Sequence, residues 1–394
     1  MEVLHVSPVF GAMSGFGGMA TSSECLCSEL AKLGVNITVI TTEATGPLPS
    51  ESRSQVQRHD ERLFRTIRLP VAGRAFERFT GIYYTRGFHA AYRKQAAAAD
   101  IVHFHGFRSY QNFAAARATR KCQKKYILQP HGSSVRGYGK GVMKIIYDYV
   151  VGIRQALSAD ALIASTQIEA LQLENLGVDS GKIHTIPNGV YRESWTRSPK
   201  SPTLFRDSLH IERDAPIVLF VGRLDSTKGL DLLVESFGPV VEKTPDAMLV
   251  LVGPDFGMQS RLEILVRRTG LKNRVVFAGP ANYETVHSAY MESKVVVIPS
   301  TYESFGLVAL EAAAAGTPVV MTEACGLAAT FRSAGLTVVT GDRRSLSKAI
   351  SRFVQDKAFR DTQRVALDRL PWERFTWREV ASAVLAIYED ASRS

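Results

Sequence analysis

The chain has 394 residues and a formal net charge of +10; 45% of its residues are hydrophobic and 22% are charged, with no low-complexity tract. This length exceeds one ordinary hydrophobic core, so we expect two globular domains. Four cysteines without a framework spacing exclude the disulfide-rich class, and no apolar run reaches the roughly 18 residues that cross a bilayer. The opening, MEVLHVSPVF, is typical of a buried strand and not of a secretory signal, which predicts a cytoplasmic protein.

In the first half of the chain, short apolar runs alternate with helix-length amphipathic stretches, the pattern of parallel α/β architecture. The expected strands are residues 2–7, 36–41, 101–104, 126–129, 161–164 and 183–186. The expected helices are residues 18–33, 110–122, 142–158 and 167–176.

A second series follows residues 192–216, whose serines, prolines and charges predict a linker. Its expected strands are residues 217–221, 248–252, 274–277, 294–298, 318–321 and 336–339. Its expected helices are residues 229–242, 259–269, 282–291, 306–315 and 344–354, with a further helical pattern at 372–390.

Two such series predict an α/β fold of two doubly wound, Rossmann-like domains that face each other across a ligand cleft. We place the domains at 1–195 and 196–371 and expect residues 372–394 to pack back on the first. Open parallel sheets bind ligands at the carboxyl ends of their strands, so the site should lie in the loops there.

Positive charge is concentrated in residues 53–125, which hold 16 lysines and arginines against 4 acidic residues. Aromatic residues are interspersed, as in Arg86, Phe88, Tyr92 and Arg93. This mixture fits an anionic membrane surface, where basic groups meet phosphates and rings lie at headgroup level. A solvated helix face and nucleic-acid binding are the alternatives; we favour the membrane surface and expect no nucleic acid.

Two short patterns leave their meaning open. The glycine-rich turn that ends in Gly17 and Gly18 suits phosphate at a helix N-terminus, but its spacing departs from the dinucleotide fingerprint, so a structural turn is an equal alternative. His103 and His105 share one face of a strand, like a metal pair that lacks further ligands. We predict no metal site and assign both histidines to acceptor contact or to structure.

Glu303 and Glu311 form the sharpest local pattern. Glu303 follows an apolar strand, and Glu311 lies eight residues later within an apolar helix. A carboxylate among such neighbours needs a hydrogen-bonding partner or a changed pKa. The vicinal hydroxyls of a ribose are one suitable partner, and a buried arginine is the other.

Together the motifs resemble the retaining GT-B glycosyltransferases of family 4, over essentially the whole chain. One departure is Tyr191, where the family's segment commonly continues with aspartate. The resemblance rests on matches in chain order at Gly17-Gly18, Pro130-His131-Gly132, Pro187-Asn188-Gly189-Val190, Phe220-Val-Gly-Arg223 with Lys228-Gly229, Leu251-Val-Gly253, and Glu303-x7-Glu311 with Gly316-Thr-Pro318.

The resemblance implies a role for each matched residue. Glu303 would hold the transferred sugar, Glu311 the ribose, and His131 would lie near the transferred sugar. Arg223 and Lys228 would offset the charge of the leaving diphosphate, since no DxD pair exists to bind a metal. Further donor contacts would come from Gly17, Gly18, Gly222, Gly253, Ser304, Phe305, Gly306 and Leu307, and acceptor contacts from His103, His105 and Asn188.

We therefore expect a retaining glycosyltransferase that moves a hexose-type sugar from a UDP- or GDP-sugar to an acceptor hydroxyl, without metal or cofactor, by same-face attack. The basic segment predicts an acceptor on a lipid carrier or a surface glycan, and an enzyme peripheral on the inner face of the membrane. A sugar-nucleotide epimerase or hydrolase would instead turn over donor without an acceptor. A non-catalytic protein that binds anionic surfaces would leave Glu303 and Glu311 dispensable.

Overall fold

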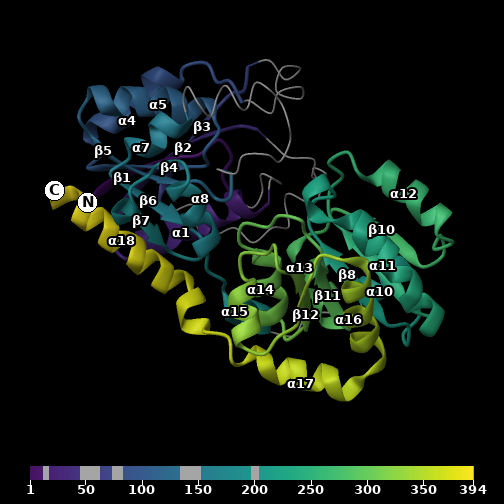
Figure 1. Cartoon of the computed structure of the whole chain (residues 1–394). Helices are drawn as coiled ribbons and strands as arrows, with labels where there is room; N and C mark the ends of the chain where they lie inside the picture. Colours follow the sequence, from purple (N-terminus) through teal and green to yellow (C-terminus); the bar gives the residue numbers. More distant parts are fainter. Residues whose placement is uncertain (12–16, 45–62, 73–82, 134–151, 197–203, 394) are drawn as a thin grey trace. The chain divides into compact units, whose positions relative to one another are not determined.

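The computed structural model describes residues 1–11, 17–44, 63–72, 83–133, 152–196 and 204–393. Within these residues the chain divides into two compact units (Figure 1). Unit 1 contains the described residues up to Gly189 together with Arg374 onwards, and unit 2 contains Val190–Glu373.

Unit 1 is built on a parallel sheet of seven strands in the order β3-β2-β1-β4-β5-β6-β7. The strands are β1 (Glu2–Val6), β2 (Asn36–Thr42), β3 (Arg65–Leu69), β4 (Ile101–His105), β5 (Lys125–Gln129), β6 (Ala161–Ala164) and β7 (Ile183–Thr185). The helices are α1 (Gly18–Lys32), α4 (Phe88–Ala98), α5 (Tyr110–Lys121), α7 (Ile153–Leu157), α8 (Gln167–Glu174), η3 (Ser180–Lys182) and α18 (Trp377–Arg393).

Unit 2 is built on a parallel sheet of six strands in the order β10-β9-β8-β11-β12-β13. The strands are β8 (Ile217–Val221), β9 (Met248–Val252), β10 (Val275–Gly279), β11 (Val295–Ile298), β12 (Val319–Thr322) and β13 (Val338–Val339). The helices are α9 (Arg192–Thr196), α10 (Leu204–Leu209), η4 (Ser226–Lys228), α11 (Leu230–Lys243), α12 (Gln259–Arg268), α13 (Tyr283–Glu292), α14 (Leu307–Ala314), α15 (Ala328–Ser333), α16 (Arg343–Gln355), α17 (Lys357–Leu367) and η5 (Trp372–Phe375).

The strands are apolar because helices cover both faces of each sheet, as parallel sheets require. In unit 1, Leu4, Val102 and Phe104 belong to a buried cluster with Phe88 and Tyr92 of α4. The predicted fold class, two doubly wound Rossmann-like α/β domains, is confirmed by these two sheets.

The last helix, α18, belongs to unit 1, where it packs against α1 (Figure 1). Val380, Val384 and Tyr388 on its inner face are buried. The other face of the β1–β4 region, which carries His5 and His103, therefore has the C-terminal helix as part of its cover.

In each unit the strand order reverses next to the first strand, between β1 and β4 in unit 1 and between β8 and β11 in unit 2. Loops that leave two such strands diverge to opposite faces of the sheet and leave a crevice at the carboxyl edge, where open α/β sheets bind ligands. The β8 and β11 loops carry the residues 222–228 and 303–307.

Several predicted elements differ from the structure. The sequence pattern missed β3, α4, α15 and α17. Residues 192–216 are not a plain linker, since they contain α9 and α10. The unit boundary falls at Gly189, six residues before the predicted one, because Trp195 packs its ring on Tyr283 and Tyr290 of unit 2.

Most of the helix predicted at residues 142–158 lies outside the described residues, and α7 accounts for its end.

Candidate functional site

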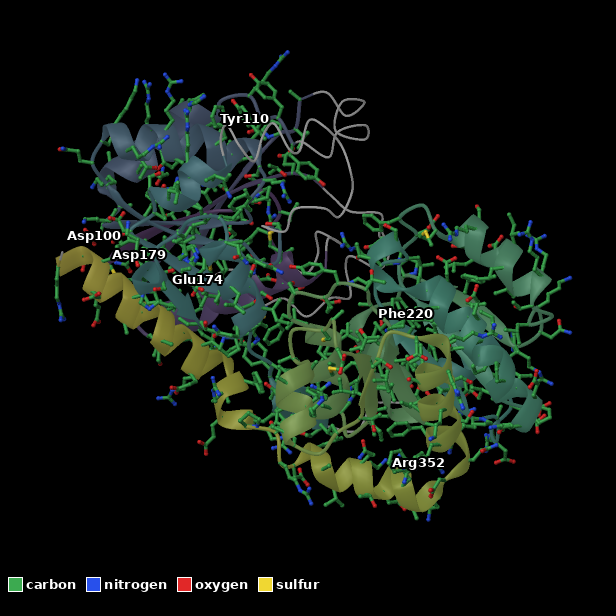
Figure 2. All side chains as sticks on the ribbon, in the orientation of Figure 1. Asp100, Tyr110, Glu174, Asp179, Phe220 and Arg352 are labelled. Atoms are coloured by element: carbon green, nitrogen blue, oxygen red, sulfur yellow. The ribbon has the colours of Figure 1, made fainter. Side chains whose placement is uncertain are left out.

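The carboxyl edge of the unit 2 sheet is packed backbone to backbone. Gly222 follows β8, the strand that contains Phe220 (Figure 2). The N–H of Gly222 donates to the carbonyl of Val252 at 2.9 Å. Gly253 follows β9 with φ 143°, and a Cβ there would stand 1.9 Å from the Gly222 carbonyl oxygen. Only glycine fits, so these positions bring the two strand-end loops together without side chains between them.

Lys228 and Glu303 form an ion pair at this edge. Lys228 Nζ lies 2.6 Å from Glu303 Oε2, and both side chains are mostly buried. The loop after β11 is held in place by backbone hydrogen bonds, since Glu303 N–H donates to the carbonyl of Ala324 and Gly326 N–H to that of Glu303. The structure thus joins two residues that are 75 positions apart in the chain.

The helix α14 begins directly beside this ion pair. Its N-cap, Gly306, has φ 100°, a conformation that favours glycine, and makes no side-chain cap. A Cβ on Gly306 would lie 3.7 Å from Cγ of Glu303 and 2.7 Å from Sγ of Cys325. With no acidic residue in the first turn, the helix presents backbone N–H groups and the positive end of its dipole. Ser304, Phe305 and Leu307 complete this strand-to-helix turn.

Glu311 lies one turn further along α14, and its carboxylate is partly buried. Its partner is the hydroxyl of Tyr290, which donates to Glu311 Oε2 at 3.1 Å, and not the buried arginine that was the alternative. Burial raises the pKa of Glu311 to about 7, because a single neutral donor does not replace the water that a carboxylate loses. The carboxyl group is therefore poised to ionise when further donors, such as hydroxyls, approach it.

Arg223 makes different contacts from those of Lys228. Its guanidinium lies 3.1 Å from Asp225 Oδ2 and over the ring of Phe256, at 5.1 Å from the centroid, and the side chain is half exposed. Asp225 also accepts from the N–H of Thr227 and so caps η4, the turn that delivers Lys228. Arg223 and Lys228, the two predicted cationic residues, both follow the carboxyl end of β8. Asp225 orients the side chain of Arg223.

In unit 1, Gly17 and Gly18 stand at the N-terminus of α1. Gly17 has φ 79°, is exposed, and makes no side-chain cap, and the first turn of α1 has no acidic residue. This resembles the start of α14, where Gly306 also precedes a first turn without a side-chain cap or an acidic residue; α4 begins in the same way behind Gly87.

His131 follows β5 in the left-handed conformation, with φ 52°. A residue other than glycine keeps such a backbone only where the surroundings enforce it. Here the buried carboxylate of Glu169 accepts from the N–H of Gly132 and, at 2.7 Å each, from the N–H and hydroxyl of Ser165. Burial lowers the pKa of His131 to about 3, so its imidazole is neutral at physiological pH.

The sequence assigns His103 and His105 to acceptor contact or to structure. Both are completely buried under the helical cover of the sheet, which favours the structural role. His5 on the neighbouring strand joins them, so the pair that lacked further ligands is a group of three whose ring nitrogens lie within 4.8 Å of one another. His105 Nδ1 in turn lies 2.9 Å from His131 Nε2.

Asn188, the third predicted acceptor contact, is buried in unit 1. Its neighbour Gly189 lies against Trp377 at the start of α18, where a Cβ would stand 2.6 Å from the indole ring. Gly189 therefore belongs to the surface on which the C-terminal helix packs.

Comparison with known proteins identifies the family. A model described as "Glycosyl transferases group 1" matches residues 203–366, and one described as "Glycosyl transferase 4-like domain" matches residues 17–189. The D-inositol 3-phosphate glycosyltransferases of Corynebacterium urealyticum and Actinosynnema mirum are each 30% identical to the chain over 98% of its length, and over 94% and 96% of their own. The chain belongs to the group 1 glycosyltransferases. It is accordingly a glycosyltransferase enzyme, as the motifs predicted.

Solved structures show the same GT-B fold in this glycosyltransferase. Sucrose-phosphate synthase from Thermosynechococcus elongatus superposes with a TM-score of 0.76 at 24% identity, over 99% of both chains. HepE of Anabaena, in complex with UDP and glucose, has a TM-score of 0.78 at 18% identity, over 99% of this chain and 100% of its own. WaaG, a glycosyltransferase involved in lipopolysaccharide biosynthesis, has 0.71 at 18%, over 98% and 99%.

The basic segment of the glycosyltransferase is described only in part, since residues 53–62 and 73–82 lie outside the described residues. Phe88 and Tyr92 are core residues and not a surface belt. The charged residues are nonetheless on the surface, and Figure 2 shows nitrogen-tipped side chains projecting from α4. The exposed set on α4, on α5 and before them is Tyr84, Arg86, Arg93, Lys94, Phe113, Arg117, Arg120 and Lys121.

Sequence reasoning missed four residues that position the enzyme's candidate site. Asp225 forms an ion pair with Arg223, and Tyr290 donates a hydrogen bond to Glu311. Glu169 accepts a hydrogen bond from Gly132 in the loop that carries His131. His5 contacts His105. His5 had a signal in the sequence, as a polar residue inside the otherwise apolar strand EVLHV, whereas Glu169 lies among other polar residues in QIEALQLE and had none.

None of the helices in the described part of the chain combines the length and the apolar character that a bilayer crossing requires.

Proposed function

We propose that this glycosyltransferase moves a hexose-type sugar from a UDP- or GDP-sugar to an acceptor hydroxyl with retention, and that unit 2 binds the donor. The observation that carries the proposal is the Lys228–Glu303 ion pair at the N-terminus of α14, with Glu311 one turn along the same helix. A nucleoside diphosphate sugar can be bound by three kinds of group placed one after another: a carboxylate for the ribose hydroxyls, hydrogen-bond donors for the diphosphate, and a second carboxylate for the sugar hydroxyls.

Each group has a defined task in this scheme. The α14 N-terminus, Lys228 and Arg223 offset the negative charge that develops on the diphosphate as it leaves. Gly222 and Gly253 allow the donor to approach the backbone at the strand ends, and Gly17 and Gly18 supply a second helix N-terminus. Glu311 accepts hydrogen bonds from the ribose, and Glu303, anchored by Lys228, accepts from the transferred sugar.

The reaction we propose needs no metal. The bond from the anomeric carbon to the leaving phosphate oxygen breaks, and the acceptor oxygen forms its bond on the same face. The acceptor proton passes to the leaving phosphate oxygen, so no enzyme base is required. The alternative is a double displacement through an enzyme carboxylate. Of the two carboxylates at the site, Glu303 is already engaged by Lys228 at 2.6 Å.

A donor screen tests the nucleotide site. The protein is mixed with UDP-, GDP- and ADP-sugars in EDTA, and thermal shift and release of diphosphate are followed. One class should stabilise the protein; HepE, whose crystal structures contain UDP and UDP-glucose, makes UDP-sugars the first choice. The stabilisation should be lost in Glu311→Ala and kept in Glu242→Ala, an exposed glutamate of the same unit. No shift with any nucleotide sugar would contradict the proposal.

For the acceptor, we propose a lipid-linked or surface-glycan hydroxyl reached by an enzyme that is peripheral on the inner face of the membrane. The support is the exposed basic set on α4 and α5 with Tyr84 and Phe113, which suits anionic headgroups. Vesicle sedimentation tests it: binding should rise with the anionic lipid fraction and fall in Arg93→Glu with Lys94→Glu. Equal sedimentation with neutral and anionic vesicles would remove this proposal.

A second acceptor class is favoured by the relatives, whose names specify D-inositol 3-phosphate. The same donor assay with a phosphorylated cyclitol and with a lipid-linked glycan separates the two. Release of diphosphate that needs neither acceptor would instead indicate a hydrolase.

A further inference from the structure

Four buried groups in unit 1 form a continuous series with half-buried His131 at its end. His131 Nε2 lies 2.9 Å from His105 Nδ1, and His105 Nε2 lies 2.9 Å from His5 Nδ1. His5 Nε2 lies 3.4 Å from the hydroxyl of Tyr388, which lies 2.6 Å from His103 Nδ1. His5, His103, His105 and Tyr388 are completely buried, so water does not interrupt the series.

All four histidines of the series are neutral. Burial lowers the pKa of His5 and of His131 to about 3, and it holds the pKa values of His103 and His105 well below their usual range. A neutral imidazole has one donor nitrogen and one acceptor nitrogen, and the tyrosine hydroxyl has one proton. When the Tyr388 hydroxyl donates its proton to one of its two histidine partners, such a series has only two consistent proton arrangements, one for each direction of donation.

His103 decides between the two directions. Its Nε2 is buried and has no hydrogen-bond partner among the described residues. If Tyr388 donated to His103 Nδ1, the proton of His103 would sit on this unpartnered nitrogen; if His103 donates, Nε2 is only an unpartnered acceptor. A buried N–H without a partner is rarer in proteins than a buried acceptor without one. The favoured direction therefore runs from His103 to Tyr388, His5, His105 and His131.

We propose that this buried series holds His131 in a single tautomer, with the proton on Nδ1 and with Nε2 occupied by the proton of His105. His131 is then a hydrogen-bond donor and cannot serve as a base. As a donor, His131 binds an oxygen of the donor sugar or of its phosphate that has a free lone pair; this role rests on the proposed function. It also agrees with a reaction in which the leaving phosphate, and not the enzyme, takes the acceptor proton. Tyr388, on the last helix, is a positioning residue for His131.

A metal ion bound by His5, His103 and His105 is the competing explanation of the cluster. Metal ligands converge with their nitrogens about 2.0–2.1 Å from the ion. Here the rings lie face to face: His103 and His105 stack with centroids 4.3 Å apart, and His5 and His105 stack with an angle of 17°. His5 Nδ1 and His105 Nε2 already lie within hydrogen-bond distance of each other, which favours the hydrogen-bonded series over a metal site.

The test uses the full-length protein with ¹⁵N-labelled histidine. NMR should show a protonated, pyrrole-like Nδ1 and a pyridine-like Nε2 for His131, His105 and His5, with each signal assigned from a His→Gln variant. Tyr388→Phe removes one hydroxyl and should leave His131 as a mixture of both tautomers. The control is Tyr126→Phe, another buried tyrosine of unit 1, whose hydroxyl donates to the carbonyl of Gln155 outside the series; it should not change His131.

Three outcomes would overturn the inference: a proton on Nε2 of His131 in the unaltered protein, no change of His131 in Tyr388→Phe, or one zinc bound per chain that is lost in His103→Gln. A kinetic arm with UDP-glucose then tests the link to catalysis. Tyr388→Phe should lower kcat about tenfold with the donor KM changed less than about twofold, while Tyr126→Phe keeps both. The NMR result needs no substrate, so failure of UDP-glucose to bind or turn over would contradict the proposed function and leave the tautomer assignment standing.

Discussion

Glu311 shows how the burial of a single carboxyl group makes the stability of the protein depend on pH. Burial raises its pKa from 4.5 to about 7, so folding favours the protonated carboxyl. The stability that the protonated form contributes is complete below about pH 4.5 and is lost as the pH rises to about 7. The size of this loss is on the order of 3 kcal/mol.

We predict that Glu311→Gln is more stable than the unaltered protein at pH 8, with little difference at pH 4.5, since glutamine keeps the Tyr290 hydrogen bond without the buried charge. Urea unfolding at the two pH values measures this. The same variant should bind UDP-sugars at least tenfold more weakly at pH 8, because an amide accepts only one strong hydrogen bond from a diol. Equal stability at both pH values would show that the carboxyl is not buried as described.

Lys228 and Glu303 depend on each other for position. Their 2.6 Å ion pair is mostly shielded, so it should contribute more than an exposed pair. A double-mutant cycle of Lys228→Met and Glu303→Gln should give a coupling energy of about 1–2 kcal/mol in the free energy of unfolding.

The matched control for that cycle is the exposed pair Arg261–Asp231, with N–O at 3.0 Å and the arginine 70% exposed, for which we expect less than about 0.5 kcal/mol. A coupling at Lys228–Glu303 no larger than that of the control would contradict the description of a shielded pair.

Among elements, the strand-end loops of unit 2 determine the shape of the proposed donor site. Gly253→Ala would place a Cβ 1.9 Å from the Gly222 carbonyl oxygen in a backbone at φ 143°. We predict a loss of at least about 3 kcal/mol in stability, with loss of UDP-sugar binding, measured by thermal unfolding and calorimetry.

The control substitution is Gly238→Ala within α11, where a Cβ meets nothing within 4 Å. It should change the free energy of unfolding by less than about 1 kcal/mol, because the higher helix propensity of alanine is opposed by the contact of its Cβ with the ring of Pro239, the next residue. If both alanines were tolerated equally, the loops could not be as closely packed as the structure shows.

At the scale of the whole molecule, the C-terminal helix belongs to the same compact unit as the N-terminal strand. Helix α18 buries Val380, Val384, Ile387 and Tyr388 in unit 1. Each such side chain contributes roughly 1.5–3 kcal/mol, so together they are comparable with the total stability of a domain, about 5–15 kcal/mol.

We therefore predict that a chain ending at Phe375 loses hydrogen-exchange protection throughout β1 and β4, while β8 and β11 keep theirs. Mass spectrometry of exchanged peptides measures both units in one sample. Unchanged protection of β1 would show that unit 1 does not need the C-terminal helix.

Much of the fold could be predicted because parallel strands covered on both faces are apolar throughout. The strands β8 and β9 were predicted at their observed bounds from this property alone. The edge strand β3, RTIRL, escaped notice because an edge strand is only partly covered and so has no apolar run. Trp195, in a polar stretch that reads as a linker, belongs to unit 2 because its ring packs on residues about 90 positions away.

The same distinction holds for the site. The sequence by itself determined the family and the two-domain class, and it singled out Lys228, Glu303, Gly306 and Glu311 as candidate site residues, because a loop that binds a fixed ligand needs particular residue types at fixed spacings along the chain. Only the tertiary structure paired Lys228 with Glu303, gave Glu311 its Tyr290 partner, and buried His103 against Tyr388, 285 positions away. Contacts across such separations depend on strand order and helix packing, which local patterns do not encode.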